Sequence, residues 1–390
     1  MSLLDPYIPL LFYLAVWAVI VVLGLLLKVD KHGIIIKPYY IMLKTVVFNS
    51  WIEKIGSRYR RAWLTFFDIG AAMGIGLVVF VIYNFIANAI ALFQHSAQAG
   101  PALVIIPLPG VTIGWDIFPY ILLAIAVLLI PHEVAHGIAS VLDKVPLKSS
   151  GVFMAVFLPG GFVEIDEQDL AKRKARTKLR VFAAGSFTNV ATWIVVFILF
   201  ANFTAAISPF YQPTSSGVLV TSLVDGGAAQ NAGIQPWSVI TSINNTIVHQ
   251  PNDLRVLLAP QEPGHHLLVA LNTGKNYTLV TKPAPENASR ATIGVYSFSY
   301  FAPRSVFPAS WTFYSFNALY WMSFILLGVA LVNMLPLVPF DGDRYLGALL
   351  GVLGVKNTKN IRTVASVISL GLLGSNIILS YILFGTIFPR

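Results

Sequence analysis

The stretch PHEVAHG, residues 131–137, decides how the rest of this chain is interpreted. It lies inside the segment from Ile117 to Leu142, which carries no other charged side chain. On a helix, His132 and His136 are four positions apart and project from one face, so both rings can bind one metal ion. Glu133 is then placed to act on a water molecule at that ion. Leaving these three groups in an apolar segment is costly, so the pattern indicates a function.

The composition places the chain in a membrane. Of 390 residues, 56% are hydrophobic and 11% are charged, whereas soluble domains carry about 25% charged residues. The chain has no cysteine, which excludes disulfides and thiolate metal sites and leaves histidine and carboxylate as metal ligands. The net charge of +9 is not accompanied by a basic patch interleaved with aromatic residues, so we expect no nucleic-acid partner.

Six segments are long and apolar enough to cross a bilayer at about 20 residues each. They are Ile8–Leu27, Leu64–Phe93, Ile117–Leu142, Val181–Ile207, Trp311–Leu335 and Thr363–Phe388. We therefore expect a polytopic α-helical membrane protein with six transmembrane helices. The first segment has no cleavage-site pattern and is interpreted as a retained helix rather than a signal peptide.

The positive charges of the connectors alternate along the chain. The connectors after the first and third spans are basic, with Lys28, Lys31, Lys37, Lys44, Lys54, Arg58, Arg60 and Arg61 in one and Lys144, Lys148, Lys172, Arg173, Lys174, Arg176, Lys178 and Arg180 in the other. The connector Gln94–Asp116 has neither Lys nor Arg. Basic loops stay in the cytoplasm, so we expect the N-terminus and the region Ser208–Pro308 on the extracytoplasmic side of the cell membrane. His132 then lies about 22 Å along its helix, toward the cytoplasmic face. The basic connectors are interpreted as solvated segments without a catalytic role.

The segment 151–165 is rich in β-branched and aromatic residues and contains Pro159-Gly160-Gly161. We interpret it as a β-hairpin or re-entrant loop that the proline and glycines break. At membrane depth its backbone needs protein or a water-filled cavity around it. Two interpretations are open: an ordinary packed hairpin, or a sheet edge that pairs with an unwound substrate strand.

The fourth span begins with Arg180 and contains Gly185 and Asn189. Gly185 permits a close approach of helices. Asn189 lies about 14 Å from the cytoplasmic end, a depth similar to that of the two histidines. Its amide is either a link between helices or a donor in the active site, and we favour the donor.

The region from about Ser208 to Tyr300 has turn dipeptides and short β-rich runs, which are typical of a soluble, mainly β insert. The sequence 225–234, together with Ile240–Asn244 and Asn252-Asp253-Leu254, resembles a PDZ domain of the bacterial protease-associated kind, although Pro236-Trp237-Ser238 replaces the usual Gly-Asp. Two roles are open: a groove that binds peptide ends, or a steric filter that excludes bulky ectodomains.

A third metal ligand is expected near the end of the fifth span. The sequence 333–343 reads NMLPLVPFDGD, where two prolines end the helix on the cytoplasmic side next to Asp341 and Asp343. A catalytic zinc ion takes three protein ligands, and two histidines with one carboxylate form a suitable set. Asp341 is the favoured third ligand, and Asp343 is the rival.

The motifs together resemble the site-2 protease family of intramembrane zinc metalloproteases. The resemblance covers about residues 117–388 and rests on three motifs in order: His132-Glu133-x-x-His136, Gly185-x-x-x-Asn189 and Asn333-x-x-Pro336-x-x-x-x-Asp341-Gly342. The family commonly has Gly-Pro at Gly185-Ser186 and often a second Gly at Asp343, and neither departure removes a ligand.

The resemblance implies the roles of the individual residues. His132, His136 and Asp341 hold Zn²⁺, and Glu133 takes a proton from the attacking water and passes it to the leaving amine. Asn189 is a candidate donor to the oxyanion, and Asn333 is a weaker one. The substrates are transmembrane proteins whose helix must unwind before cleavage.

The expected organisation has four parts: an N-terminal membrane region at 1–116, two halves of the metalloprotease core at 117–207 and 305–390, and the PDZ-like domain at 208–304. Two other functions compete with an intramembrane protease. A metal-ion transporter would use the same His/Glu/Asp site at the midplane of the membrane, but no repeated half is visible. A silent scaffold that binds partners through the PDZ-like domain would not need Glu133 and all three ligands.

Overall fold

The computed structural model describes residues 8–27, 33–102, 106–156, 158–285, 287–385 and 388. The chain forms two compact units: unit 1 combines Met1–Val195 with Trp321–Arg390, and unit 2 is Val196–Tyr320. Unit 2 contains the predicted insert 208–304. Lys28 and Lys31, which entered the predicted topology, lie outside the described residues, as does Phe157 in the predicted hairpin.

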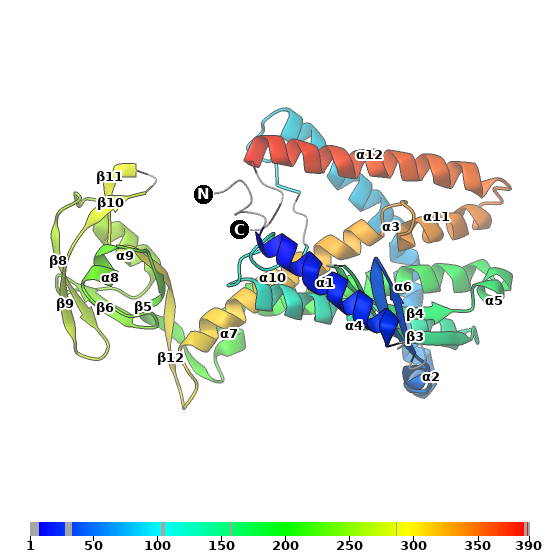
Figure 1. Ribbon diagram of the computed structural model, residues 1–390, viewed down its shortest axis with the longest axis horizontal. Coiled ribbons are helices and arrows are strands. Elements are labelled where there is room, and N and C mark those ends of the chain that lie inside the picture. The colour runs from blue at the N-terminus through cyan, green and yellow to red at the C-terminus, as the bar shows by residue number, and fades with distance from the viewer. Residues whose placement is uncertain are drawn as a thin grey trace. The chain divides into compact units, whose positions relative to one another are not determined.

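Six helices of the described chain are long and apolar enough to cross a membrane, one for each predicted span (Figure 1). They are α1 (Ile8–Leu26), α3 (Arg60–Phe93), α4 (Phe118–Leu142), α6 (Ala175–Ala201), α10 (Ser310–Asn333) and α12 (Thr358–Phe384). A helix satisfies its own backbone hydrogen bonds, which is required in hydrocarbon. These six helices fit a polytopic helical membrane protein.

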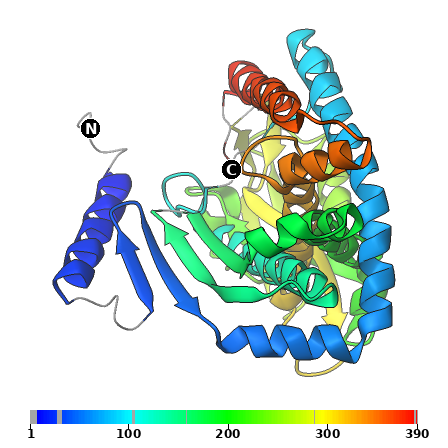
Figure 2. The ribbon, with the colours of Figure 1, turned by 90° about the vertical axis from the view of Figure 1, so that its right-hand side faces the viewer.

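Helices α4 and α6 form the centre of unit 1. In the most apolar 18-residue stretch of each helix, 44% of the residues of α4 and 50% of those of α6 are buried, compared with 11% of those of α1. The contact is close because small residues of α4, Ala135 and Ala139, face Ala184 of α6 in one apolar cluster. Figure 2 shows α1 beside the first two strands and apart from the other spans. The two helices that carry most of the site motifs are therefore the ones packed most tightly.

Four antiparallel strands of unit 1 form one sheet in chain order. They are β1 (Ile34–Lys37), β2 (Tyr40–Thr45), β3 (Leu147–Ala155) and β4 (Leu158–Ile165). The predicted hairpin corresponds to β3 and β4, whose register runs from Leu147 opposite Ile165 to Ala155 opposite Leu158. Strands β1 and β2 fall within the first basic connector, which the sequence indicates only as a solvated segment between two spans. Whether the hairpin enters the membrane stays a prediction.

The expected break at Pro159-Gly160-Gly161 is wrong, because these residues continue strand β4 opposite Met154, Phe153 and Val152. Proline is tolerated here because β4 is the last strand of the sheet. The glycines leave room for neighbouring groups. A Cβ at Gly160 would collide with the ring of Phe153, and one at Gly161 would lie 3.1 Å from Cγ of Glu133.

Helix α2 (Val47–Arg58) and the short helix α5 (Glu167–Lys172) border the sheet and the spans. Asp166 caps α5, because its side chain accepts hydrogen bonds from the backbone N–H groups of Gln168 and Asp169. The N–H of Asp169 lowers the pKa of the Asp166 carboxyl below its usual range. Helix α2 packs its buried face, Asn49, Ile52 and Gly56, against α4 and β3.

An ion network joins α3, α4 and α6 at one end. The Arg180 guanidinium lies 2.6 Å from Asp68 of α3 and 3.1 Å from Asp143, which follows the last residue of α4. Arg176 reaches the same Asp68 at 2.7 Å. The interpretation of Arg180 as part of a solvated connector is wrong: its side chain is buried, because two carboxylates from neighbouring helices compensate its charge.

Helix α11 (Asp341–Val352) begins directly after the two prolines that are predicted to end the fifth span. Its first turn is pressed against the end of α10, since a Cβ at Gly342 would collide with the carbonyl groups of Met334 and Leu335. The buried Tyr345 donates a hydrogen bond of 2.5 Å to the carbonyl of Ala71 in α3. These contacts fix the position of Asp341 at the start of α11.

Unit 2 is mainly β, with an apolar core. Its sheet has the order β12-β5-β6-β8-β9, with β7 paired to β6 and a separate pair β10-β11. The elements are α7 (Phe203–Ile207), β5 (Tyr211–Leu223), α8 (Ala228–Asn231), β6 (Val239–Ile243), β7 (Thr246–Ile247), α9 (Pro251–Leu258), β8 (His266–Leu271), β9 (Asn276–Val280), β10 (Lys282–Ala284), β11 (Asn287–Thr292) and β12 (Val295–Pro303). The resemblance to a PDZ domain stays a prediction.

Candidate metal centre and active site

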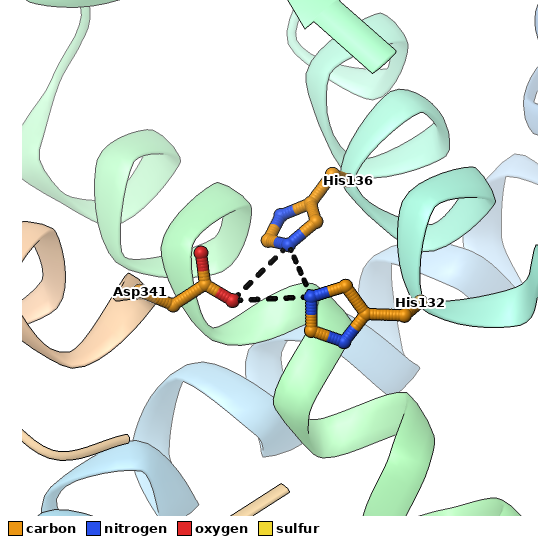
Figure 3. A group of neighbouring side chains, drawn as sticks. All are labelled: His132, His136 and Asp341. Carbon is orange, nitrogen blue, oxygen red and sulfur yellow. Dashed lines mark hydrogen bonds and ion pairs between the residues drawn. The ribbon is translucent and has the colours of Figure 1, made fainter. Parts of the chain in front are cut away.

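Two neighbouring turns of α4 and the first turn of α11 bring three ligand groups together (Figure 3). The Nε2 atoms of His132 and His136 lie 3.2 Å apart. Oδ2 of Asp341 lies 3.4 Å from the Nε2 atom of His132 and 3.2 Å from that of His136. Each residue offers one ligand atom, and the three atoms could hold a metal ion. The third ligand comes from a residue more than 200 positions away along the chain.

The three ligand atoms suit a divalent metal ion. Oδ2 of Asp341 is buried and has no hydrogen-bond partner among the described residues. The Nδ1 atom of His136 lies 2.7 Å from the carbonyl of Val181, to which it can only donate, so in the neutral ring Nε2 carries a lone pair. Lone pairs that face one another in a buried site repel, and a cation among them removes the repulsion. Two imidazoles and one carboxylate form a donor set that Zn²⁺ accepts.

Gly185 keeps space open beside the two histidines. A Cβ at this position would lie 2.5 Å from Cε1 and Nε2 of His132 and 2.5 Å from Nε2 of His136. Real Cβ atoms do not come so close to other atoms, and rings that bind a metal cannot move away freely. The sequence analysis gave Gly185 a role in helix approach; the structure adds that this approach occurs at the ligand atoms themselves.

Asn189 lies behind His132, on the side away from Asp341. Its Nδ2 atom is 3.0 Å from Nδ1 of His132, while its Oδ1 atom is buried and has no hydrogen-bond partner in the described part of the chain. For Nε2 of His132 to bind a metal, Nδ1 must carry the proton, and an amide turned by 180° would accept it through Oδ1. This arrangement makes Asn189 a positioning residue for the ring. Its predicted role as an oxyanion donor stays a prediction.

Strand β4 holds the side chain of Glu133. The backbone N–H of Val163 donates a hydrogen bond of 3.1 Å to Oε2 of Glu133. The sequence analysis missed this contact and the contact between His136 and the carbonyl of Val181. Contacts of backbone groups do not depend on residue type, so they leave no pattern in the sequence. The one hint of a close approach between β4 and Glu133 is the pair Gly160-Gly161.

Asn333 and Asp343 have different surroundings. Asn333 ends α10 and lines the same cavity as the two histidines. The buried carboxylate of Asp343 accepts two hydrogen bonds from the Arg362 guanidinium, one of them at 2.9 Å from Nε. Asp343 is therefore paired with Arg362, and the cluster that could hold a metal ion contains Asp341.

A cavity of about 1700 Å³ adjoins the cluster and is lined by residues of β2, β3, β4, α4, α5, α6, α10, α11 and α12. Charged residues from several of these elements lie along its wall, and two ion pairs are among them. Lys44 lies 2.5 Å from Glu164, and Arg344 lies 3.2 Å from Glu167. The Lys44 ammonium lowers the pKa of the Glu164 carboxyl below its usual range. These ion pairs make part of the cavity wall polar, as a route for water to buried groups requires.

Comparisons with known proteins agree with this geometry. The sequence model of peptidase family M50 matches residues 120–375, which hold all three ligand residues. A membrane-bound transcription factor site-2 protease homolog of Arabidopsis thaliana is 28% identical over 228 residues, which cover 56% of this chain and 42% of that protein. An uncharacterized protein of Methanocaldococcus jannaschii is 25% identical over 332 residues, 83% of this chain and 82% of that protein. The match to the family extends over more than half of the chain, and the protein therefore belongs to peptidase family M50, the site-2 protease family of metalloproteases.

Proposed function

We propose that this protein is an intramembrane zinc endopeptidase that cuts membrane-anchored proteins within or near a transmembrane helix, as a step of regulated intramembrane proteolysis. One observation carries the proposal: Nε2 of His132, Nε2 of His136 and Oδ2 of Asp341 converge in a buried cluster with Glu133 on the same helix. The family match and the Arabidopsis site-2 protease homolog support the protease class.

The residues of the chain divide the work of hydrolysis. A zinc ion held by the cluster would supply a Lewis acid that polarises a peptide carbonyl and makes a water molecule more acidic. Glu133 takes the proton from the attacking water and later gives it to the leaving amine. The N–H of Val163 holds Oε2 of Glu133 in one orientation. Asn189 and Val181 fix the rings of His132 and His136 through their outer nitrogens.

The substrate must reach the site in an extended form. Peptide bonds inside a helix are protected by hydrogen bonds, so a helix-breaking residue in the substrate lowers the cost of unwinding. Strand β4 ends the sheet, and its outer edge passes Glu133. An unwound substrate strand that paired with this edge would bring its carbonyl groups close to the metal. This supports the substrate-pairing interpretation of the hairpin over simple packing.

The topology belongs to the same proposal. The alternation of basic and neutral connectors favours an active site toward the cytoplasmic side and an extracytoplasmic unit 2. Unit 2 would then either bind peptide ends or exclude bulky ectodomains. The metal-transporter alternative is not favoured, because the family match is to a peptidase family.

The test uses purified full-length protein and a reporter with a single transmembrane helix. Glu133→Gln keeps the three ligands but removes the general base, so we expect a full zinc content and a loss of cleavage of about 10³-fold. Glu262→Gln, an exposed glutamate of unit 2, is the matched control and is expected to cleave at the wild-type rate. A chelator should abolish wild-type cleavage. Undiminished cleavage by Glu133→Gln would overturn the proposal.

A further inference from the structure

Helix α2 presents an unusual outer face. Its buried face packs on α4 and β3, and the opposite face contains Val47, Trp51, Lys54 and Arg58 at positions i, i+4, i+7 and i+11, which share one side of a helix. Val47 is 71% exposed and Trp51 is 51% exposed. The outer face is therefore apolar in its first half and cationic in its second.

Further residues extend both halves of this face. Val46 and Phe48 are exposed beside Val47 and enlarge the apolar part. Arg61, in the first turn of α3, is exposed and adds a third cation. Glu53 is the one acidic residue of α2. Within the described chain, Lys54 and Arg61 form no ion pair, and the Arg58 guanidinium lies 5.4 Å from the ring of Tyr59. Among the residues that the structure describes, no carboxylate therefore neutralises Lys54 or Arg61.

The position of α2 relates this face to the membrane. Helix α2 leads directly into α3, a candidate membrane span, and Figure 2 shows α2 lying crosswise to α3. A helix that lies crosswise at the end of a spanning helix runs along the membrane surface. Tryptophan favours the headgroup level of a bilayer, and Lys and Arg favour anionic headgroups. An apolar surface with exposed cations at this depth suits a lipid surface.

We propose that the outer face of α2 binds anionic phospholipid: Val47, Phe48 and Trp51 enter the boundary between headgroups and acyl chains, and Lys54, Arg58 and Arg61 bind the phosphate groups. Interfacial helices bind membranes through buried apolar area together with attraction of Lys and Arg to anionic lipid. The proposal concerns lipid recognition and goes beyond the proposed peptidase activity.

The inner face of the same helix supports the metal-binding helix. A Cβ built at Gly137, the residue after His136, would lie 3.0 Å from Cγ2 of Ile52 and 3.3 Å from Cγ1 of Val163. Ile52 is buried, and Val163 is the residue whose N–H holds Glu133. Lipid bound to α2 would therefore hold in place a helix that contacts Gly137, the neighbour of the candidate ligand His136.

The first experiment counts bound lipid. Full-length protein is reconstituted in nanodiscs of phosphatidylcholine with phosphatidylglycerol, and native mass spectrometry measures the phosphatidylglycerol retained after transfer to mild detergent. Lys54→Gln/Arg58→Gln is compared with Lys356→Gln/Lys359→Gln, which removes two exposed cations elsewhere. At about fivefold for each cation, the α2 variant should lose about 25-fold in lipid affinity, while the control stays near wild type. Equal retention by the two variants would overturn the proposal.

A second measurement locates the lipid without changing any charge. Brominated phosphatidylglycerol quenches a tryptophan that it contacts, and brominated phosphatidylcholine gives the background at the same mole fraction. We expect Trp51→Phe to remove the excess quenching by phosphatidylglycerol and Trp237→Phe, in unit 2, to keep it. Excess quenching that persists in Trp51→Phe, or that is absent from the wild type, contradicts the proposal.

Discussion

The interiors of the two units hold different kinds of residue. Among the described residues, unit 2 buries only two polar side chains, those of Thr281 and Thr312, and its core cluster includes Val220, Ile240 and Leu267. The interface of α4 and α6 in unit 1 buries polar groups as well: His132, His136, Ser140, Arg180, Ser186 and Asn189. An apolar core stabilises a fold through buried area, whereas buried polar groups cost free energy unless each has a partner.

The comparison separates residues that stabilise the fold from residues that hold the chemistry. In unit 2, a change of volume should alter stability and leave the metal site intact. In unit 1, a change near α4 and α6 should alter the metal site first, because its groups are held by single contacts such as those of Val163 and Val181. Substitutions matched between the units test this separation.

The largest effect is expected for Gly185→Ala. The new Cβ would lie 2.5 Å from ring atoms of both histidines, so the rings must leave their positions. We expect a loss of metal affinity of about 100-fold or more, with a matching loss of activity. Gly76→Ala in α3 is the control, since a Cβ there meets nothing within 4 Å. Titration with zinc measures the affinity. A wild-type affinity in Gly185→Ala would contradict the claim that substitutions between α4 and α6 act on the metal site first.

A smaller effect, confined to unit 2, is expected for Ile240→Ala. Ile240 is fully buried in the core of unit 2, so the cavity should lower the free energy of unfolding of this unit by about 2–5 kcal/mol. Ile247→Ala removes an exposed side chain of β7 and should change it by less than about 0.5 kcal/mol. Hydrogen exchange of unit 2 peptides measures both, and zinc content should stay constant. Loss of zinc in Ile240→Ala would show that the units are not independent.

The smallest effect is expected for Asp253, whose side chain caps the N-terminus of helix α9 at the surface of unit 2. The backbone N–H of His249 donates a hydrogen bond of 2.8 Å to the Asp253 carboxylate. This bond lowers the pKa of Asp253 from its usual value of 3.8. A lowered folded-state pKa means that the carboxylate stabilises unit 2 above about pH 4 and loses this effect as pH falls through the folded value. Asp253→Asn should therefore be less stable than wild type at pH 7, with a difference that shrinks below pH 4. A difference that is constant from pH 7 to pH 3 would contradict this assignment.

The sequence predicts the spans and the ligand residues because both depend on local patterns. Six uncharged or nearly uncharged segments match six apolar helices. The spacing of His132 and His136 places both on one helix face, and the structure brings Asp341 to them. A strong hydropathy signal and a four-residue spacing need no knowledge of tertiary contacts.

The missed features depend on contacts between distant segments. Strand β2 pairs with β3 across about 100 residues, and β4 continues through Pro159 because it is the last strand of the sheet. Arg180 is buried because Asp68 and Asp143 come from other helices. The backbone groups of Val163 and Val181 act through position alone. None of these features leaves a pattern of residue types in the local sequence.

The central claim is that His132, His136 and Asp341 hold one metal ion. The most direct test is the metal content of purified full-length protein, measured by inductively coupled plasma mass spectrometry for wild type, Asp341→Ala and Asp343→Ala. The two acids lie two residues apart in the first turn of α11, but only Asp341 reaches the histidines, while Asp343 pairs with Arg362. We predict one zinc ion per chain in wild type and Asp343→Ala, and loss of zinc in Asp341→Ala. A full zinc content in Asp341→Ala would contradict the account.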